Sequence, residues 1–228
     1  MPKLGPTQPI GSLPMKLSFA LRPLALAVVL SAGAAHAAVD VYNDEASFLA
    51  AIGNYATDTF DDLIPGDPYE GPLVRSAGDV GYTVSTAPTS PILYGAGTVG
   101  DAWLSSNEAS DFIVFEGFST PIYAIGAYAF GSDIFGGFQP TGLTAARVTT
   151  AEGQTVDFTF RAGVDNYFGF VSTSAITMFE VKTFYGDRNV TWPTVDDLTV
   201  AAVPEPGTYA MLLAGLAAVG FMARRRNH

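Results

Sequence analysis

Cysteine is absent from the sequence, and histidine occurs only twice, at His36 and at His228. Without thiols the chain has no disulfide bonds, no thiolate metal ligands and no cysteine nucleophile. Because no imidazole lies between the two histidines, a Ser-His-Asp triad and the usual histidine-bearing zinc or iron sites are excluded from that stretch. Acid–base chemistry there would depend on carboxylates, tyrosines, lysine and arginine.

Positive charge is also scarce. Residues 38–203 contain 21 of the 22 acidic residues but only five of the 11 basic residues, a net charge of −16. Such a stretch repels phosphate backbones, so we expect no nucleic-acid partner. Its 166 residues fit one exported domain, and they are rich enough in Phe, Val, Ile and Tyr to build a core without disulfides.

Residues 1–37 predict an N-terminal extension followed by a signal peptide. Lys16 and Arg22 are its positive charges, residues 24–30 are its apolar region, and Ala35 and Ala37 are the small residues of a cleavage site. The alternative is an apolar anchor that is never cleaved. The sequence leaves open whether Met1 or Met15 starts translation.

The last 26 residues, 203–228, form a tail of three parts. Its residues are, in order, Pro204, Glu205 and Pro206, then the uncharged run 207–223, then Arg224, Arg225 and Arg226. A helix over 207–223 would rise about 25 Å, the short end of what spans a bilayer core of about 30 Å. The arginines would stay in the cytoplasm, which places the body of the chain across the membrane. The alternative is a buried C-terminal helix of a soluble domain.

This tail resembles the PEP-CTERM sorting signal of Gram-negative bacteria, which combines a Pro-Glu-Pro segment, an apolar helix and a basic end in this order. The resemblance implies export across the inner membrane, anchoring by the helix, and processing by an exosortase near residues 204–206. The protein would then reach the cell surface or the extracellular matrix. Members of this family tend to accompany exopolysaccharide and biofilm production.

Residues 38–202 predict an all-β domain, an antiparallel jelly-roll-like β-sandwich with one short N-terminal helix over residues 43–53. Asn43 is placed to cap this helix, and Gly53 is placed to end it. Short apolar runs separated by Gly and Pro turns follow, and residues 131–142 predict a long mobile loop. The predicted strands are 57–63, 80–86, 92–94, 111–116, 121–131, 143–150, 154–161, 167–173, 176–185 and 195–201. The order of these runs also resembles bodies common among PEP-CTERM proteins, which are similar to lectin-like and carbohydrate-binding jelly rolls.

Two acidic pairs, Asp61 with Asp62 and Asp196 with Asp197, are the candidate metal ligands. In a jelly roll the first and last strands are often neighbours, so these carboxylates could meet and hold Ca²⁺. The alternative is that each pair caps a strand or a turn. Otherwise we expect no cofactor.

Aromatic side chains are the candidate sugar contacts. Trp103, in a polar segment before Ser105, and Tyr94 could present ring faces to a sugar, whereas Trp192 is expected to serve packing. The sequence thus favours an exported, non-catalytic envelope or matrix protein. The alternatives are a carbohydrate-binding module and, less favoured, a glycoside hydrolase that uses two carboxylates.

Overall fold

A computed structural model of the chain describes residues 38–140, 142–161, 166–184, 190–202 and 215–216. The predicted signal peptide and nearly all of the tail, including residues 204–206 and 224–226, lie outside these ranges. Within them, no helix is both long enough and apolar enough to cross a membrane. Residues 38–202, where described, belong to one compact unit.

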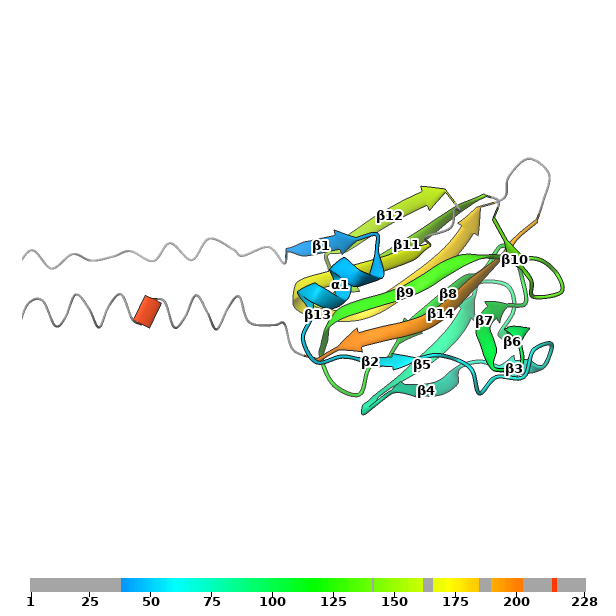
Figure 1. Cartoon of the computed structure of the whole chain (residues 1–228), viewed down its shortest axis with the longest axis horizontal. Helices are drawn as coiled ribbons and strands as arrows, with labels where there is room; N and C mark the ends of the chain where they lie inside the picture. Colours follow the sequence, from blue (N-terminus) through cyan, green and yellow to red (C-terminus); the bar gives the residue numbers. More distant parts are fainter. Residues whose placement is uncertain (1–37, 141, 162–165, 185–189, 203–214, 217–228) are drawn as a thin grey trace, which may run out of the picture. The chain divides into compact units, whose positions relative to one another are not determined.

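The domain consists of one helix and fourteen strands (Figure 1). In chain order they are β1 (Val39–Tyr42), α1 (Glu45–Ala51), β2 (Ala56–Asp58), β3 (Pro68–Glu70), β4 (Leu73–Ala77), β5 (Val80–Ala87), β6 (Ile92–Thr98), β7 (Asp101–Ser106), β8 (Phe112–Glu116), β9 (Ile122–Ser132), β10 (Phe138–Gln139), β11 (Leu143–Thr150), β12 (Thr155–Arg161), β13 (Tyr167–Phe184) and β14 (Trp192–Ala201). Every pairing between these strands is antiparallel.

The strands form two packed sheets that share the long strand β13. Its first part, Tyr167–Val171, pairs with β9, and the sheet continues through β14, β7 and β6 to β3. Its second part pairs with β11 and β8, and that sheet continues to β12 on one side and to β5 and β4 on the other. The prediction of an antiparallel β-sandwich is therefore confirmed.

The core lies between the two sheets, where alternate side chains of each strand point inward. Along β5 the residues alternate between buried and half-buried positions, as expected for a strand with one face in the core. The rings of Phe158 in β12 and Phe168 in the first part of β13 meet edge to face across the sandwich, 5.7 Å apart. Phe115, Phe170 and Phe179 are fully buried in the same cluster.

Helix α1 differs from its prediction at the N-terminus. Asp44, not Asn43, is the N-cap: its backbone is extended and its Oδ1 accepts a hydrogen bond from the Ser47 N–H at 2.8 Å. This is the usual reach of an N-cap side chain to the third helical residue. The helix ends at Ala51 with Ile52 as the C-cap, one residue before Gly53. It lies against the outer face of the first sheet, over β13 and β9 (Figure 1).

Candidate ligand-binding site

Three hydroxyl groups meet on the outer face of the first sheet. Leu104 and Val195 point into the core, so the next residue of β7, Ser105, and the preceding residue of β14, Thr194, point outward. The Thr194 Oγ1 lies 3.1 Å from the Ser105 Oγ and 2.9 Å from the Ser132 Oγ of β9. The hydroxyls hydrogen-bond to one another. Those of Ser105 and Ser132 give this part of the sheet a polar surface, and the fully buried Thr194 lies behind them.

A cavity of about 470 Å³ lies over this polar surface. Residues 94–96, 105–107 and 132–136 line it, together with Gly66 and Trp192. Two of its walls are aromatic, because Tyr94 and Trp192 both face it. The Trp192 indole N–H donates a hydrogen bond to the Asn107 carbonyl at 2.9 Å, which fixes the ring at the wall. Tyr94, which was predicted as a sugar contact, lines the cavity. Trp192, which was predicted to serve packing, lines it as well.

The third wall is the turn between β9 and β10, in the stretch predicted as a long mobile loop. The structure differs in the length of this loop, because β9 runs to Ser132 and β10 follows at Phe138–Gln139. The Asp133 carboxylate closes the short turn between them: its Oδ1 accepts hydrogen bonds from the Phe135 and Gly137 N–H groups at 2.8 and 2.9 Å. The Asp133 N–H also donates to the Gly137 carbonyl at 2.8 Å. At the tip of this turn, Ile134 and Phe135 are 72% and 92% exposed.

Trp103 supports the turn from below. It lies in strand β7, and it is half-buried. Its ring packs edge to face on Phe130 with the centroids 5.2 Å apart, and its indole N–H donates to the Gly136 carbonyl at 3.1 Å. The Gly97 N–H donates to the same carbonyl. Trp103, predicted as a sugar contact, is thus a support of the cavity wall and does not line the cavity itself.

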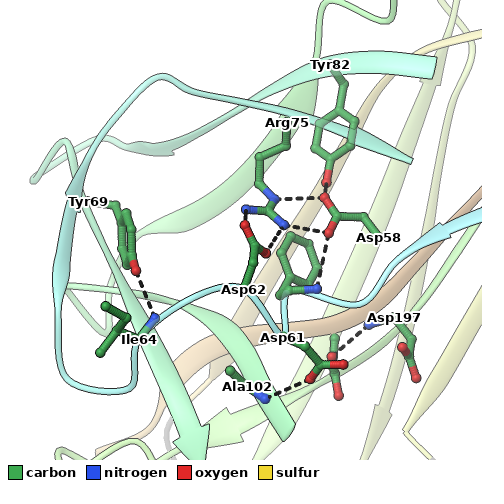
Figure 2. Close-up of polar contacts among 11 residues, drawn as sticks. Asp58, Asp61, Asp62, Ile64, Tyr69, Arg75, Tyr82, Ala102 and Asp197 are labelled. Atoms are coloured by element: carbon green, nitrogen blue, oxygen red, sulfur yellow. Dashed lines mark hydrogen bonds and ion pairs between the residues drawn. The ribbon is translucent and has the colours of Figure 1, made fainter. Parts of the chain in front are cut away.

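The two predicted acidic pairs do not form one ligand set, although Asp61 lies close enough to Asp196 and Asp197 to interact with them electrostatically. β2 does pair with β14, Leu198 opposite Asp58, so the first and last predicted strands are neighbours. However, Asp62 turns to Arg75, whereas the Asp61 Oδ1 accepts a hydrogen bond from the Ala102 N–H at 3.1 Å (Figure 2). Within the ranges that the structure describes, no three carboxylates or other metal-binding side chains lie close enough together to hold an ion.

Arg75 is the centre of a charged cluster that the sequence did not point to (Figure 2). Its guanidinium donates to both oxygens of the buried Asp58 at 2.7 and 2.6 Å, and to both oxygens of Asp62 at 2.6 and 3.1 Å. The Tyr82 hydroxyl donates to Asp58 at 2.6 Å. Hydrogen bonding to Arg75 lowers the pKa of Asp62, and burial, together with the Asp58 charge, raises the pKa of Tyr82. The cluster ties β2 and the turn after it to β4 and β5.

Asp196 is the most strongly perturbed carboxylate of the outer face. Burial, and then the negative charges of Asp197, Asp101 and Asp61, raise the pKa of Asp196 to about 7. The pKa of Asp197 is raised as well, by burial and by the charge of Glu45. Protonation of Asp196 therefore relieves repulsion in the folded protein near neutral pH.

We expect Asp196→Asn to stabilise the protein at pH 8 by about 2 kcal/mol, because 1.36 kcal/mol corresponds to one pKa unit and part of the repulsion is screened by water. The pKa of Asp196 is 3.8 in the unfolded state and about 7 in the folded state, so the folded state binds the proton more tightly. The free energy of unfolding therefore falls as the pH rises from about 4 to 7. Urea unfolding at pH 8 and pH 4 checks this. An equal gain at both pH values would contradict it.

The described domain is a β-sandwich with an open cavity. Serine hydroxyls form the floor of this cavity, and Tyr94 and Trp192 form two of its walls. A model of the PEP-CTERM protein-sorting motif matches residues 202–226. The chain is thus a PEP-CTERM domain-containing protein, and this motif marks it as an exported protein and implies processing by an exosortase. A search of curated protein sequences finds no match.

Solved structures similar to the chain include two from Clostridium thermocellum and one from Porphyromonas gingivalis W83. The first is xylanase 10B, whose CBM22-1 and GH10 modules were solved with xylohexaose (12% identity, 66% of this chain, TM-score 0.37), and the chain spans 28% of it. The K1 cleaved adhesin domain of Lys-gingipain shows 12% identity over 66% of this chain and 99% of its own, with a TM-score of 0.31. A family 35 carbohydrate-binding module shows 15% identity over 60% and 100%, with a TM-score of 0.28.

Proposed function

We propose that this exported protein is a non-catalytic component of the cell envelope or extracellular matrix, and that it binds polysaccharide in the cavity of its first sheet. The observation that carries the proposal is the cavity itself. Its volume of about 470 Å³ falls in the range of about 300–1,000 Å³ that is common for ligand sites. Its aromatic walls and its hydroxyl groups match the two kinds of surface that a sugar presents, apolar C–H faces and polar hydroxyl edges.

The residues that line the cavity support a binding role over a catalytic one. Asp133 is the only carboxylate among the lining residues that the structure describes, and its Oδ1 already accepts two hydrogen bonds within the turn. Glycoside hydrolysis usually needs two carboxyl groups on either side of the scissile bond, about 5–10 Å apart. We therefore propose that the cavity binds its ligand without cleaving it, and without a metal ion.

Tyr94→Ala is expected to weaken polysaccharide binding at least tenfold, because it removes an aromatic wall of the cavity. Binding can be measured by electrophoresis through gels that contain single polysaccharides, with and without EDTA. The matched control is Tyr55→Ala, since Tyr55 is 49% exposed and does not line the cavity. Equal retardation of both variants would rule out the cavity as the binding site, and a loss of binding in EDTA would rule out the metal-free mode.

The sorting part of the proposal has its own experiment. The intact mass and the fractionation of the protein would be measured in its host with and without the exosortase. We expect a chain that begins near Ala38 and ends near Pro204, and that is absent from the strain without the enzyme. A chain that keeps Arg226 in the membranes of both strains would instead mean a permanent C-terminal anchor.

A further inference from the structure

We propose that the cavity selects an uncharged sugar chain, and that Phe135 supplies the surface on which one sugar ring packs. This inference rests on the proposed polysaccharide binding and names the class of ligand and the main contact residue. It follows from two separate properties of the cavity, its charge and the position of the turn after β9.

The described lining of the cavity carries negative charge. Among the described residues that line it there is no lysine, arginine or histidine, and Asp133 carries a negative charge. A second carboxylate stands at the edge, because the side-chain amide of Asn107, a lining residue, donates to Glu108 at 3.3 Å. A uronate or sulfated sugar would enter this field without a cation to pair with, and charges within about 8 Å are only partly screened at physiological salt. An uncharged sugar meets no such penalty.

The backbone at Phe135 is held by hydrogen bonds, whereas its ring is exposed. The ring is 92% exposed, at the tip of a turn that Asp133 closes from inside and that Trp103 holds from below. A large apolar side chain in water at the rim of a cavity is an unfavourable arrangement that a ligand would relieve. Aromatic faces pack well on the C–H faces of sugar rings, and those faces carry no charge. The hydrogen bonds of the turn hold the Phe135 backbone at the rim before the ligand arrives, which reduces the backbone entropy lost on binding.

The test compares neutral and anionic chains on the purified exported protein. A linear β-glucan and a galactomannan serve as neutral probes, and alginate and hyaluronate serve as anionic probes, each in calorimetric titrations at low and high salt. We expect neutral chains to bind with an affinity that changes less than about twofold with salt, and anionic chains not to bind. Phe135→Ala is expected to weaken neutral binding about tenfold, whereas Phe135→Tyr keeps it. Phe184→Ala is the matched control, since Phe184 is 45% exposed and lies outside the cavity lining.

The outcomes separate this inference from the function on which it rests. Preferential binding of alginate or hyaluronate that Tyr94→Ala abolishes would overturn the charge argument and leave polysaccharide binding intact. Neutral binding that Phe135→Ala does not change would overturn the role of Phe135. If the wild-type protein binds none of the four chains, and no other polysaccharide retards it in gels, the proposed function itself fails.

Discussion

Arg75→Met is expected to lower the free energy of unfolding by about 3–5 kcal/mol, the usual cost of removing one partner from a buried ion pair. The Arg75 side chain is 11% exposed and that of Asp58 is 5% exposed, so the carboxylate has little water to replace the guanidinium. Tyr82 and the Phe60 N–H would still donate to Asp58, at 2.6 and 3.1 Å, but neither donor carries the charge that balances the carboxylate. Urea unfolding followed by tryptophan fluorescence measures the loss.

A matched control comes from the second arginine that pairs with an aspartate in the described part of the chain. Arg147 also approaches its partner, Asp157, to 2.6 Å, but these side chains are 43% and 59% exposed. Exposed pairs contribute about 0–1 kcal/mol, so Arg147→Met should cost no more than that. Equal losses for both arginine variants would contradict the view of the Arg75 cluster as a buried pair.

A double variant identifies the cause of the loss. If the cost of Arg75→Met comes from a buried carboxylate left without a partner, then replacing that carboxylate as well should return part of the stability. We expect Asp58→Asn combined with Arg75→Met to be more stable than Arg75→Met alone. A double variant in which the two losses simply add would show that packing, and not charge, makes Arg75 important.

The existence of the sandwich could be predicted because its signals are local. In residues 154–161 apolar and polar side chains alternate, and this run became β12 in a hairpin with β11. Residues 111–116 show a different local signal, a continuous apolar run as in a central strand, and they lie as β8 between β13 and β5. Both signals depend only on which faces of a strand are buried, so a short window of sequence reveals them.

The contacts that build the site depend on strand register over long distances. The hydroxyls of Ser105, Ser132 and Thr194 meet because β7, β9 and β14 are neighbours, and up to 89 residues separate them in the chain. In the same way, Arg75 contacts not only Asp62 of the conspicuous pair but also Asp58 in β2. No local pattern distinguishes these residues from other polar residues, so the sequence pointed to Tyr94 but missed the polar surface beside it.

The turn after β9 shows a different kind of failure. The glycines in residues 131–142 favour a loop when they are considered alone, because glycine leaves the backbone many conformations. In the structure, hydrogen bonds hold the backbone of this turn. They join it to one side chain within the turn, Asp133, and to one outside it, Trp103. A glycine-rich segment with a well-placed aspartate can thus be a fixed wall of a site.

The last expected result concerns Phe48, through which α1 is attached to the first sheet. Phe48→Ala should cost about 3–5 kcal/mol, because the ring is fully buried and its loss leaves a cavity. Two glycines that lie opposite each other in β9 and β13, Gly126 and Gly169, make the space for the ring. A Cβ at Gly169 would lie 2.6 Å from the Phe48 Cγ, and one at Gly126 would lie 2.8 Å from the Cε1. Neither glycine has a positive φ, so what they supply is room for the ring.

Gly169→Ala in the wild-type background should therefore cost about 1–3 kcal/mol through overpacking. In the Phe48→Ala background the ring atoms are gone and only the Cβ of residue 48 remains, at 3.0 Å, so the cost should be clearly smaller. Gly81→Ala is the control, since its Cβ would come no closer than 3.5 Å to its nearest neighbour, Ser119. Urea unfolding of the four proteins of the cycle gives the coupling energy. Independent, additive losses would mean that α1 moves aside to admit the methyl group, and that the glycines are not what fixes the helix to the sheet.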